Sequence, residues 1–250
     1  MTTPAPASVR QRAIAHAGWE TRLLLRNGEQ LLLTIVIPVG ILLGLTMTDV
    51  LVQQSGPDRI PRAIATVLAV SVISSAFTSL AIATGFERRS GALRFLGTTP
   101  LTRTELLVGK FCATAAVTAL SSAVVCVVAV LIGWRPSASA LWAVPVLILG
   151  TAAFAAWGMA LAGLLRAEAV LAVANGLFLF LIMFGGVIIP AASLPGPMSV
   201  VADLLPSGAL VTGLTDSLVD GQMPSGLAVI VLIVWLASGA LVSSRTFRWS

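Results

Sequence analysis

Six long apolar segments constrain the fold of this chain more than any other feature of its sequence. They cover residues 31–52, 64–86, 111–133, 141–165, 170–190 and 226–243. A helix of about 20 apolar residues crosses the roughly 30 Å of hydrocarbon in a bilayer. Only 10% of the 250 residues are charged, against about 25% in soluble domains. We therefore expect an all-α integral membrane protein with six transmembrane helices, which excludes a soluble enzyme, a secreted disulfide scaffold and a disordered protein.

The basic residues are distributed unevenly between the two sides of such a six-span arrangement. With the N-terminus in the cytoplasm, twelve of the fifteen Lys and Arg residues fall on the inner side, and only Arg59, Arg62 and Arg135 fall outside. Cytoplasmic loops of membrane proteins carry an excess of Lys and Arg. The distribution predicts that both termini are cytoplasmic, and it accounts for the net charge of +5 without a nucleic-acid partner.

Two segments outside the apolar spans have patterns of their own. Residues 1–30 begin with a polar tail, and residues 8–29 mix four Arg residues with Ile14, Trp19, Leu23 and Leu24. This mixture predicts an amphipathic helix lying along the membrane surface. Residues 31–250 are then expected to form a single transmembrane domain.

Residues 191–222 are moderately apolar, but Asp203, Pro206 and Asp216 interrupt them. Acidic residues and proline are costly at membrane depth without special support. We therefore expect short re-entrant or interfacial helices on the outer side, between spans five and six, in place of a seventh span.

Small polar residues are the main polar groups within the spans. Ser71, Ser75 and Ser79 recur every four residues in the second span, and Asn175 lies in the fifth. Such residues let helices pack closely and exchange hydrogen bonds. They either pack between helices or line a polar path, and the sequence leaves both interpretations open. No charged residue lies near the middle of a span, which argues against an ion-coupled carrier.

Catalytic and metal-binding patterns are missing from the sequence. One histidine, His16, and two cysteines, Cys112 and Cys126, cannot build the usual zinc site. The pair Gly109-Lys110 resembles the end of a P-loop, but Thr104 and Phe111 occupy positions where the motif requires Gly and Ser or Thr. We expect no catalytic residue, no metal and no cofactor site in this chain.

The segment 87–110 between spans two and three is the most informative. It contains a charged start, a short amphipathic stretch with Leu93 and Leu96, and Pro100. A second helix is predicted to begin at Thr102, with Glu105 completing a capping box. Two short helices with apolar faces on a cytoplasmic loop form a docking surface for a partner.

This loop resembles the one found in permease subunits of type-2 ABC exporters. The matching residues are Glu87, Arg88, Gly91, Leu93, Leu96, Thr99, Pro100, Leu101, Glu105, Leu106, Gly109 and Lys110. A second match, which in that family marks the end of span five and its re-entrant helices, comprises Gly185, Gly186, Pro190, Pro195 and Pro206. The compact size is most similar to the permeases of daunorubicin-resistance-like drug exporters.

The resemblance implies a permease subunit without its own ATPase site, in a bacterial plasma membrane. Its partners would be an ABC ATP-binding subunit, which binds ATP and magnesium, a second identical or different permease, and membrane lipid. Segment 87–110 would couple ATP hydrolysis to export of hydrophobic or amphipathic drugs, and the helix at residues 8–29 would pack beside it. Two alternatives remain: export of a lipid-linked glycan or cell-envelope precursor, and a membrane enzyme or assembly factor with no transport role.

Overall fold

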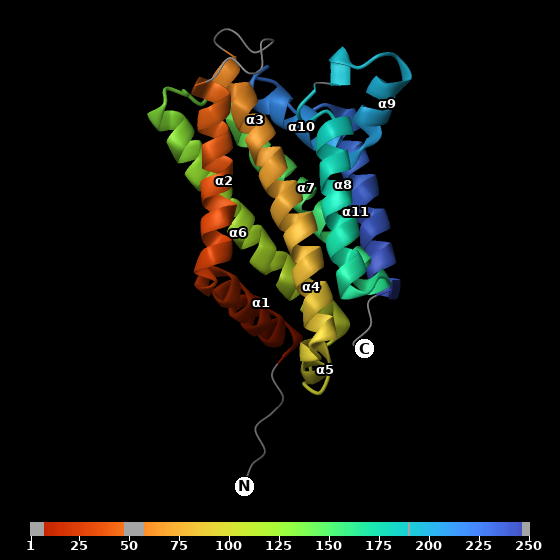
Figure 1. Cartoon of the computed structure of the whole chain (residues 1–250). Coiled ribbons are helices and arrows are strands. Elements are labelled where there is room, and N and C mark those ends of the chain that lie inside the picture. Colours follow the sequence, from red (N-terminus) through yellow and green to blue (C-terminus); the bar gives the residue numbers. More distant parts are fainter. Residues whose placement is uncertain (1–7, 48–57, 190, 247–250) are drawn as a thin grey trace.

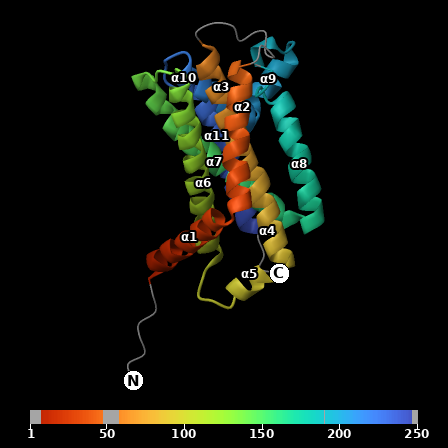
Figure 2. The ribbon, with the colours of Figure 1, turned by 60° about the vertical axis from the view of Figure 1, so that its left-hand side comes forward.

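A computed structural model describes residues 8–47, 58–189 and 191–246, and these residues form helices and turns without a strand. Most helices lie side by side in a bundle, whereas α1 (Val9–Arg26) crosses one end of it obliquely (Figures 1 and 2). The short α5 (Ala92–Leu96) projects from this same end, which we call the α1 end. The predicted all-helical fold is confirmed.

Five described helical segments are long and apolar enough to cross a membrane. They are Arg59–Arg89, Arg103–Leu131, Ala138–Leu164, Ala167–Phe184 and Gly226–Thr246. Each overlaps one of the predicted spans from the second to the sixth. The largest differences are at two ends: α6 (Arg103–Leu131) begins eight residues before the predicted residue 111, and α8 (Ala167–Phe184) ends six residues before residue 190. The helix stops there because Gly186 adopts a positive φ of 74°, which turns the chain.

The predicted first span corresponds to α2 (Gly28–Met47), which contains Pro38. Its apolar part, Thr34–Met47, is shorter than the other spans, and residues 48–52 of the prediction lie outside the described residues. In Figure 1, α2 runs alongside α3 and α6 in the bundle.

Two short helices occupy the segment for which a seventh span was rejected. They are α9 (Pro197–Leu204) and α10 (Pro206–Leu218), bent by 84° relative to each other. Pro206 is the first residue of α10, where a proline costs no helical hydrogen bond. The pair lies opposite α1 (Figure 1), at what we call the α10 end. Counted as one broken span, it would bring the number of described span candidates to six.

The centre of the bundle is one continuous helix packed against α7 (Ala143–Leu164). This central helix comprises α3 (Arg59–Val72), a π-helical stretch η2 (Ile73–Ser79) and α4 (Leu80–Arg89). Phe77 and Phe154 meet edge to face across the contact, with ring centroids 6.4 Å apart. A Cβ on Gly158 of α7 would lie 2.9 Å from the carbonyl oxygen of Phe77, so glycine permits the close approach.

The remaining helices surround this pair. The last helix, α11 (Gly226–Thr246), packs along α7, where Trp157 donates from Nε1 to the carbonyl oxygen of Trp235 at 3.0 Å. Short 3₁₀ turns, η3 (Ala138–Trp142) and η4 (Ala191–Ser193), precede α7 and α9. By contrast, α8 stands at the edge of the bundle (Figure 2) and exposes large apolar side chains such as Leu179 and Phe180.

Candidate functional site

The loop between α4 and α6 folds into a compact structure with its own small apolar core. Gly91 leaves α4 with a φ of 81°, a left-handed conformation that glycine adopts without strain, and α5 follows directly. Leu93 of α5 and Leu106 of α6 are both fully buried against each other, with Leu96 and Leu107 packed around them. The loop is therefore held against the start of α6.

The predicted capping box at the start of α6 is confirmed. The Thr102 hydroxyl accepts from the Glu105 backbone N–H at 3.3 Å, and Glu105 Oε2 accepts from the Thr102 backbone N–H at 2.6 Å. Two backbone donors that α6 would otherwise leave unpaired are thus satisfied.

The second oxygen of Glu105 contacts α1. Glu105 Oε1 accepts from Arg12 Nε at 3.2 Å and from Arg12 Nη2 at 3.0 Å. With 4% of its side chain exposed, Glu105 faces α1 and offers no open surface to another protein. The residue that we expected on a docking surface instead ties α1 to the base of that surface.

The helix α1 packs with its polar side inward. Arg12, His16 and Glu20, spaced four residues apart, face α6, while Ile14, Trp19 and Leu23 are exposed. His16 sits against Gly109, where an added Cβ would lie 2.3 Å from His16 Cδ2. Gly109 was predicted as a coupling residue. Its missing side chain leaves the space that the His16 ring of α1 occupies.

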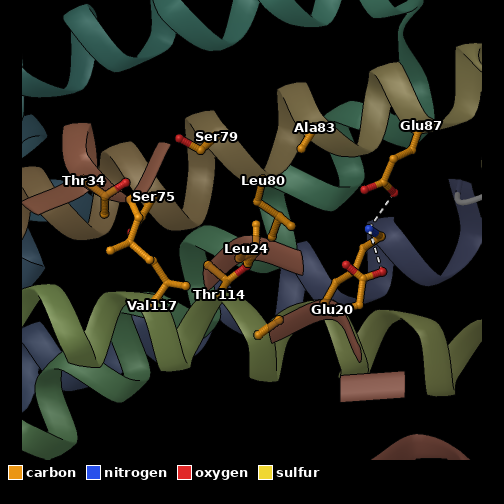
Figure 3. Close-up of a pocket in the computed structure, with 13 residues that line it drawn as sticks. Glu20, Leu24, Thr34, Ser75, Ser79, Leu80, Ala83, Glu87, Thr114 and Val117 are labelled. Atoms are coloured by element: carbon orange, nitrogen blue, oxygen red, sulfur yellow. Dashed lines mark hydrogen bonds and ion pairs between the residues drawn. The ribbon is translucent and has the colours of Figure 1, made fainter. Parts of the chain in front are cut away.

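A buried lysine joins three helices at this junction. Lys110 Nζ of α6 lies 2.6 Å from Glu87 Oε2 of α4 and 3.2 Å from Glu20 Oε1 of α1. Figure 3 shows the two carboxylates of Glu87 and Glu20 directed at one nitrogen. Since Lys110 is almost fully buried, each carboxylate compensates a charge that would be costly alone. We call His16, Glu20, Glu87 and Lys110 the junction cluster.

A cavity of about 40 Å³ extends from the junction cluster along α4 and the π-helical stretch η2. At one end it is lined by Glu20, Glu87 and Lys110, and at the other by Thr34, Ser75 and Ser79 (Figure 3). This volume is sufficient for a few water molecules, and drug-sized ligands need about 300–1,000 Å³.

The predicted serine series is divided between two kinds of contact. Ser75 Oγ lies 2.8 Å from Thr118 Oγ1 of α6, and it also donates to the carbonyl oxygen of Ser71 at 2.7 Å. Ser71 is buried and donates to Val67, whereas Ser79 lines the cavity. The π-helical geometry disrupts the regular four-residue spacing that the sequence suggested.

Arg88 forms hydrogen bonds with the turn that joins α7 to α8. Its guanidinium donates to the carbonyl oxygen of Gly163 at 3.0 Å and to that of Leu165. These carbonyls lie at the C-terminus of α7, where a cation is favoured. The adjacent Arg89 pairs with Glu168 of α8 on the surface. The arginines that begin the predicted coupling loop thus hold α4 to α7 and α8.

The other loop residues form its exposed tip. Pro100 is exposed, and Thr99 and Leu101 are half-buried. The Phe95 side chain is 74% exposed on the face of α5 opposite the buried Leu93. An apolar surface of this kind remains available to another protein.

Glycines provide close packing at the α10 end, and one of them, Gly185, belongs to the pair predicted near the end of span five. A Cβ on Gly185 would lie 1.8 Å from Ser207 Oγ, and one on Gly208 would lie 1.9 Å from the carbonyl oxygen of Ala202. Pro206 is buried and Pro195 is exposed, while Pro190 lies outside the described residues.

Asn175 contributes neither to the cavity nor to packing within the chain. Its side chain is exposed on α8, and Nδ2 donates to the carbonyl oxygen of Leu171 at 2.8 Å. The helix itself supplies the partner that an amide in hydrocarbon requires.

The described residues contain no candidate metal site. No group of three or more His, Cys, Asp and Glu residues in residues 8–47, 58–189 and 191–246 is arranged to hold a metal ion. The absence of a cofactor remains a prediction.

The resemblance implied that the helix at residues 8–29 packs beside segment 87–110, but sequence reasoning did not predict which side chains join them. It assigned His16 no chemistry and did not connect Arg12 or Glu20 with Lys110. Two signals were present: Lys110 is the single lysine beside fourteen arginines, and Arg12, His16 and Glu20 share one helical face.

The comparison with known families gives one match. A family model described as ABC-2 type transporter matches residues 15–219, which is most of the chain and includes α5, the α9–α10 pair and α1 from residue 15 onward. No curated protein matches the chain.

Proposed function

The chain belongs to the ABC-2 type transporter family, whose members are permease components of ABC transporters, and we propose that it is the membrane subunit of an ATP-driven exporter. It is a multi-pass membrane protein with helices long enough to span the bilayer.

The exposed tip of α5 is the observation that carries this proposal. Phe95 presents an apolar side chain outward, while Leu93 anchors the opposite face of α5 on Leu106. The base of the loop is tied to α1 by the Arg12–Glu105 pair and to both α1 and α4 by Lys110. A partner that pushed on α5 would therefore move three helices together.

We assign ATP and magnesium to a separate ABC ATP-binding subunit. The family implies such a partner, and Gly109-Lys110, the one pair that resembled a P-loop, is occupied in packing His16 and pairing two carboxylates. A second permease, identical or different, completes the transporter.

We place the cargo path between two permeases. The cavity of about 40 Å³ beside Ser75 and Ser79 is too small for a drug-sized molecule. The exposed apolar face of α8, with Leu177, Phe180 and Phe184, would suit a hydrophobic or amphipathic cargo such as a drug. Because Ser75 already pairs with Thr118, this serine serves helix packing in this proposal.

The orientation follows from the basic residues at the α1 end. Arg12, Arg22, Arg88, Arg94 and Lys110 all belong to α1, α4, α5 or the first turns of α6. Lys and Arg accumulate on the cytoplasmic side of membrane proteins. The α1 end and both termini would then face the cytoplasm of a bacterial cell.

Two matched substitutions test the docking surface. Phe95 and Leu141 are equally exposed, at 74%, but Leu141 lies in η3 at the other end of the bundle. The tagged chain, purified from its native cells, should bring down an ATP-hydrolysing subunit. Phe95→Asp should abolish this recovery, and Leu141→Asp should leave it unchanged. Equal recovery with both variants, or no ATP hydrolysis in any eluate, would contradict the proposal.

A further inference from the structure

A single oxygen atom in the junction cluster faces two cationic or potentially cationic groups. Glu20 Oε1 lies 3.2 Å from Lys110 Nζ of α6 and 3.5 Å from His16 Nε2, one turn earlier on α1. His16 is 6% exposed, and its Nε2 has no hydrogen-bond partner among the described residues. The Lys110–Glu20 contact joins two helices, whereas the His16–Glu20 contact lies within one.

We propose that the junction cluster is a proton switch. When His16 is protonated, the Glu20 carboxylate pairs with His16 in place of Lys110, and α1 is held less tightly to α6. The movement of α1 follows from the geometry of this chain alone. Its consequence for transport, a slower coupling of ATP hydrolysis to export when the cytoplasm is acidic, rests on the proposed function.

Lys110 can lose Glu20 because it has another partner. Glu87 Oε2 lies closer to Lys110 Nζ, at 2.6 Å, than Glu20 Oε1 does. After protonation of His16, the pairs would be His16–Glu20 within α1 and Lys110–Glu87 between α6 and α4. All four groups remain compensated, but the ion pair that joins α1 to α6 at this point is lost.

The close packing around His16 also favours separation of α1 from α6 when His16 is protonated. Its ring lies against Gly109, without space for a Cβ between them, so the imidazole is buried and closely packed. A charged imidazole would be poorly solvated there. Proton uptake therefore favours an arrangement in which α1 stands farther from α6.

The surrounding charges determine the direction of the pH dependence. His16 is faced by Glu20 on its own helix, by Lys110 of α6, and by Glu87 of α4 behind Lys110, while Arg12 and Glu105 pair with each other one turn away. Burial lowers the pKa of His16 below 6.5; Glu20 opposes this shift, and Lys110 adds to it.

The packed form thus holds His16 neutral, and the loosened form binds the proton more readily. A group with a depressed pKa in the packed form stabilises that form at higher pH, and the stabilisation is lost as the pH falls. Acidification below the ordinary histidine pKa should therefore release α1, and neutral or basic pH should hold it.

Spin labels can measure this movement in the purified full-length chain. Ala15 of α1 and Val127 of α6 are exposed, and both can be changed to cysteine once Cys112 and Cys126 are replaced by serine. In lipid nanodiscs the distance distribution between the labels should shift to longer values from about pH 8 to about pH 5. His16→Gln should keep the short distance at both pH values, and Glu20→Gln should give the long distance at both.

Because the chain contains a single histidine, its titration can be followed directly by nitrogen NMR. Replacing Glu20 with Gln should raise the His16 midpoint toward the ordinary histidine value, because this variant holds the loosened form, in which the burial that lowers the pKa of His16 is relieved. The comparison of the two His16 midpoints tests the proposed switch even if the His16→Gln variant does not fold.

Two results would overturn the switch. One is a wild-type distance distribution that does not change with pH, or that changes equally in His16→Gln. The other is a His16 midpoint that is unaffected by Glu20→Gln. Neither measurement involves an ATP-binding subunit, so failure of the switch and failure of the proposed coupling function are observed separately.

Discussion

The two ends of the helical bundle are held together by different kinds of interaction. At the α1 end, helices meet through charged side chains: Arg12 with Glu105, and Lys110 with both Glu20 and Glu87. At the α10 end, helices meet through glycines that let backbones touch, at Gly185 and Gly208. Ion pairs have discrete alternative partners, whereas close backbone packing has none. In the switch that we propose, the α1 end rearranges while the α10 end remains fixed.

The largest effect is expected from removing the cation of the junction cluster. Lys110→Met leaves the carboxylates of Glu20 and Glu87 without their partner and should destabilise the protein by about 3–5 kcal/mol. Arg89→Met is the matched control, because the Arg89–Glu168 pair is more than half exposed and should contribute at most about 1 kcal/mol. Chemical unfolding in detergent compares the two. Similar losses would show that burial of Lys110 does not govern its contribution.

A steric substitution tests the α10 end. Gly208→Ala would place a Cβ 1.9 Å from the backbone oxygen of Ala202, and forcing α9 and α10 apart should cost about 1–3 kcal/mol. The control, Gly176→Ala on α8, has open space around its Cβ and should stabilise the helix by about 0.5–1 kcal/mol. Thermal unfolding of both variants gives the sign and size. A neutral Gly208→Ala would mean that this end is as adaptable as the other.

The Arg12–Glu105 pair should show measurable coupling between α1 and α6. A double-mutant cycle with Arg12→Met and Glu105→Gln should give a larger interaction energy than a cycle at a surface ion pair. A parallel cycle at the exposed Arg89–Glu168 pair should give less than about 1 kcal/mol. If the Arg12–Glu105 coupling is no larger than that of the surface pair, α1 is not held through this contact.

The smallest effect is expected in the middle of the bundle. Ser75→Ala removes the contact with Thr118 and should cost about 0.5–1.5 kcal/mol. Asn175→Ala, which removes only a bond to its own helix, should change the unfolding free energy by less than about 0.5 kcal/mol. A larger effect of Asn175→Ala would point to a partner for α8 outside this chain.

Local sequence patterns predicted those features that depend on neighbouring residues. The apolar spans, the capping box of Thr102 and Glu105, and the pair of short helices around Pro206 all follow from residues close together in the chain. The end of α8 was predicted six residues too late, because apolar composition continues past Gly185 and Gly186 while the helical backbone does not.

The candidate site depended on contacts that no local pattern contains. Arg12 and Glu105 are separated by 93 residues, and Lys110 and Glu20 by 90. The helix α1 was predicted to lie along the membrane surface and, from the family resemblance, beside segment 87–110. Its exposed Ile14, Trp19 and Leu23 agree with that view, but its polar face is occupied by α6.

The sequence by itself determined that this chain is a helical membrane protein, because too few charged residues exist to face water and each apolar segment satisfies its own backbone as a helix. Only the tertiary structure decided which charged residues meet. A buried charge must find a counter-charge wherever the fold brings one within reach, and that choice depends on how α1, α4 and α6 cross.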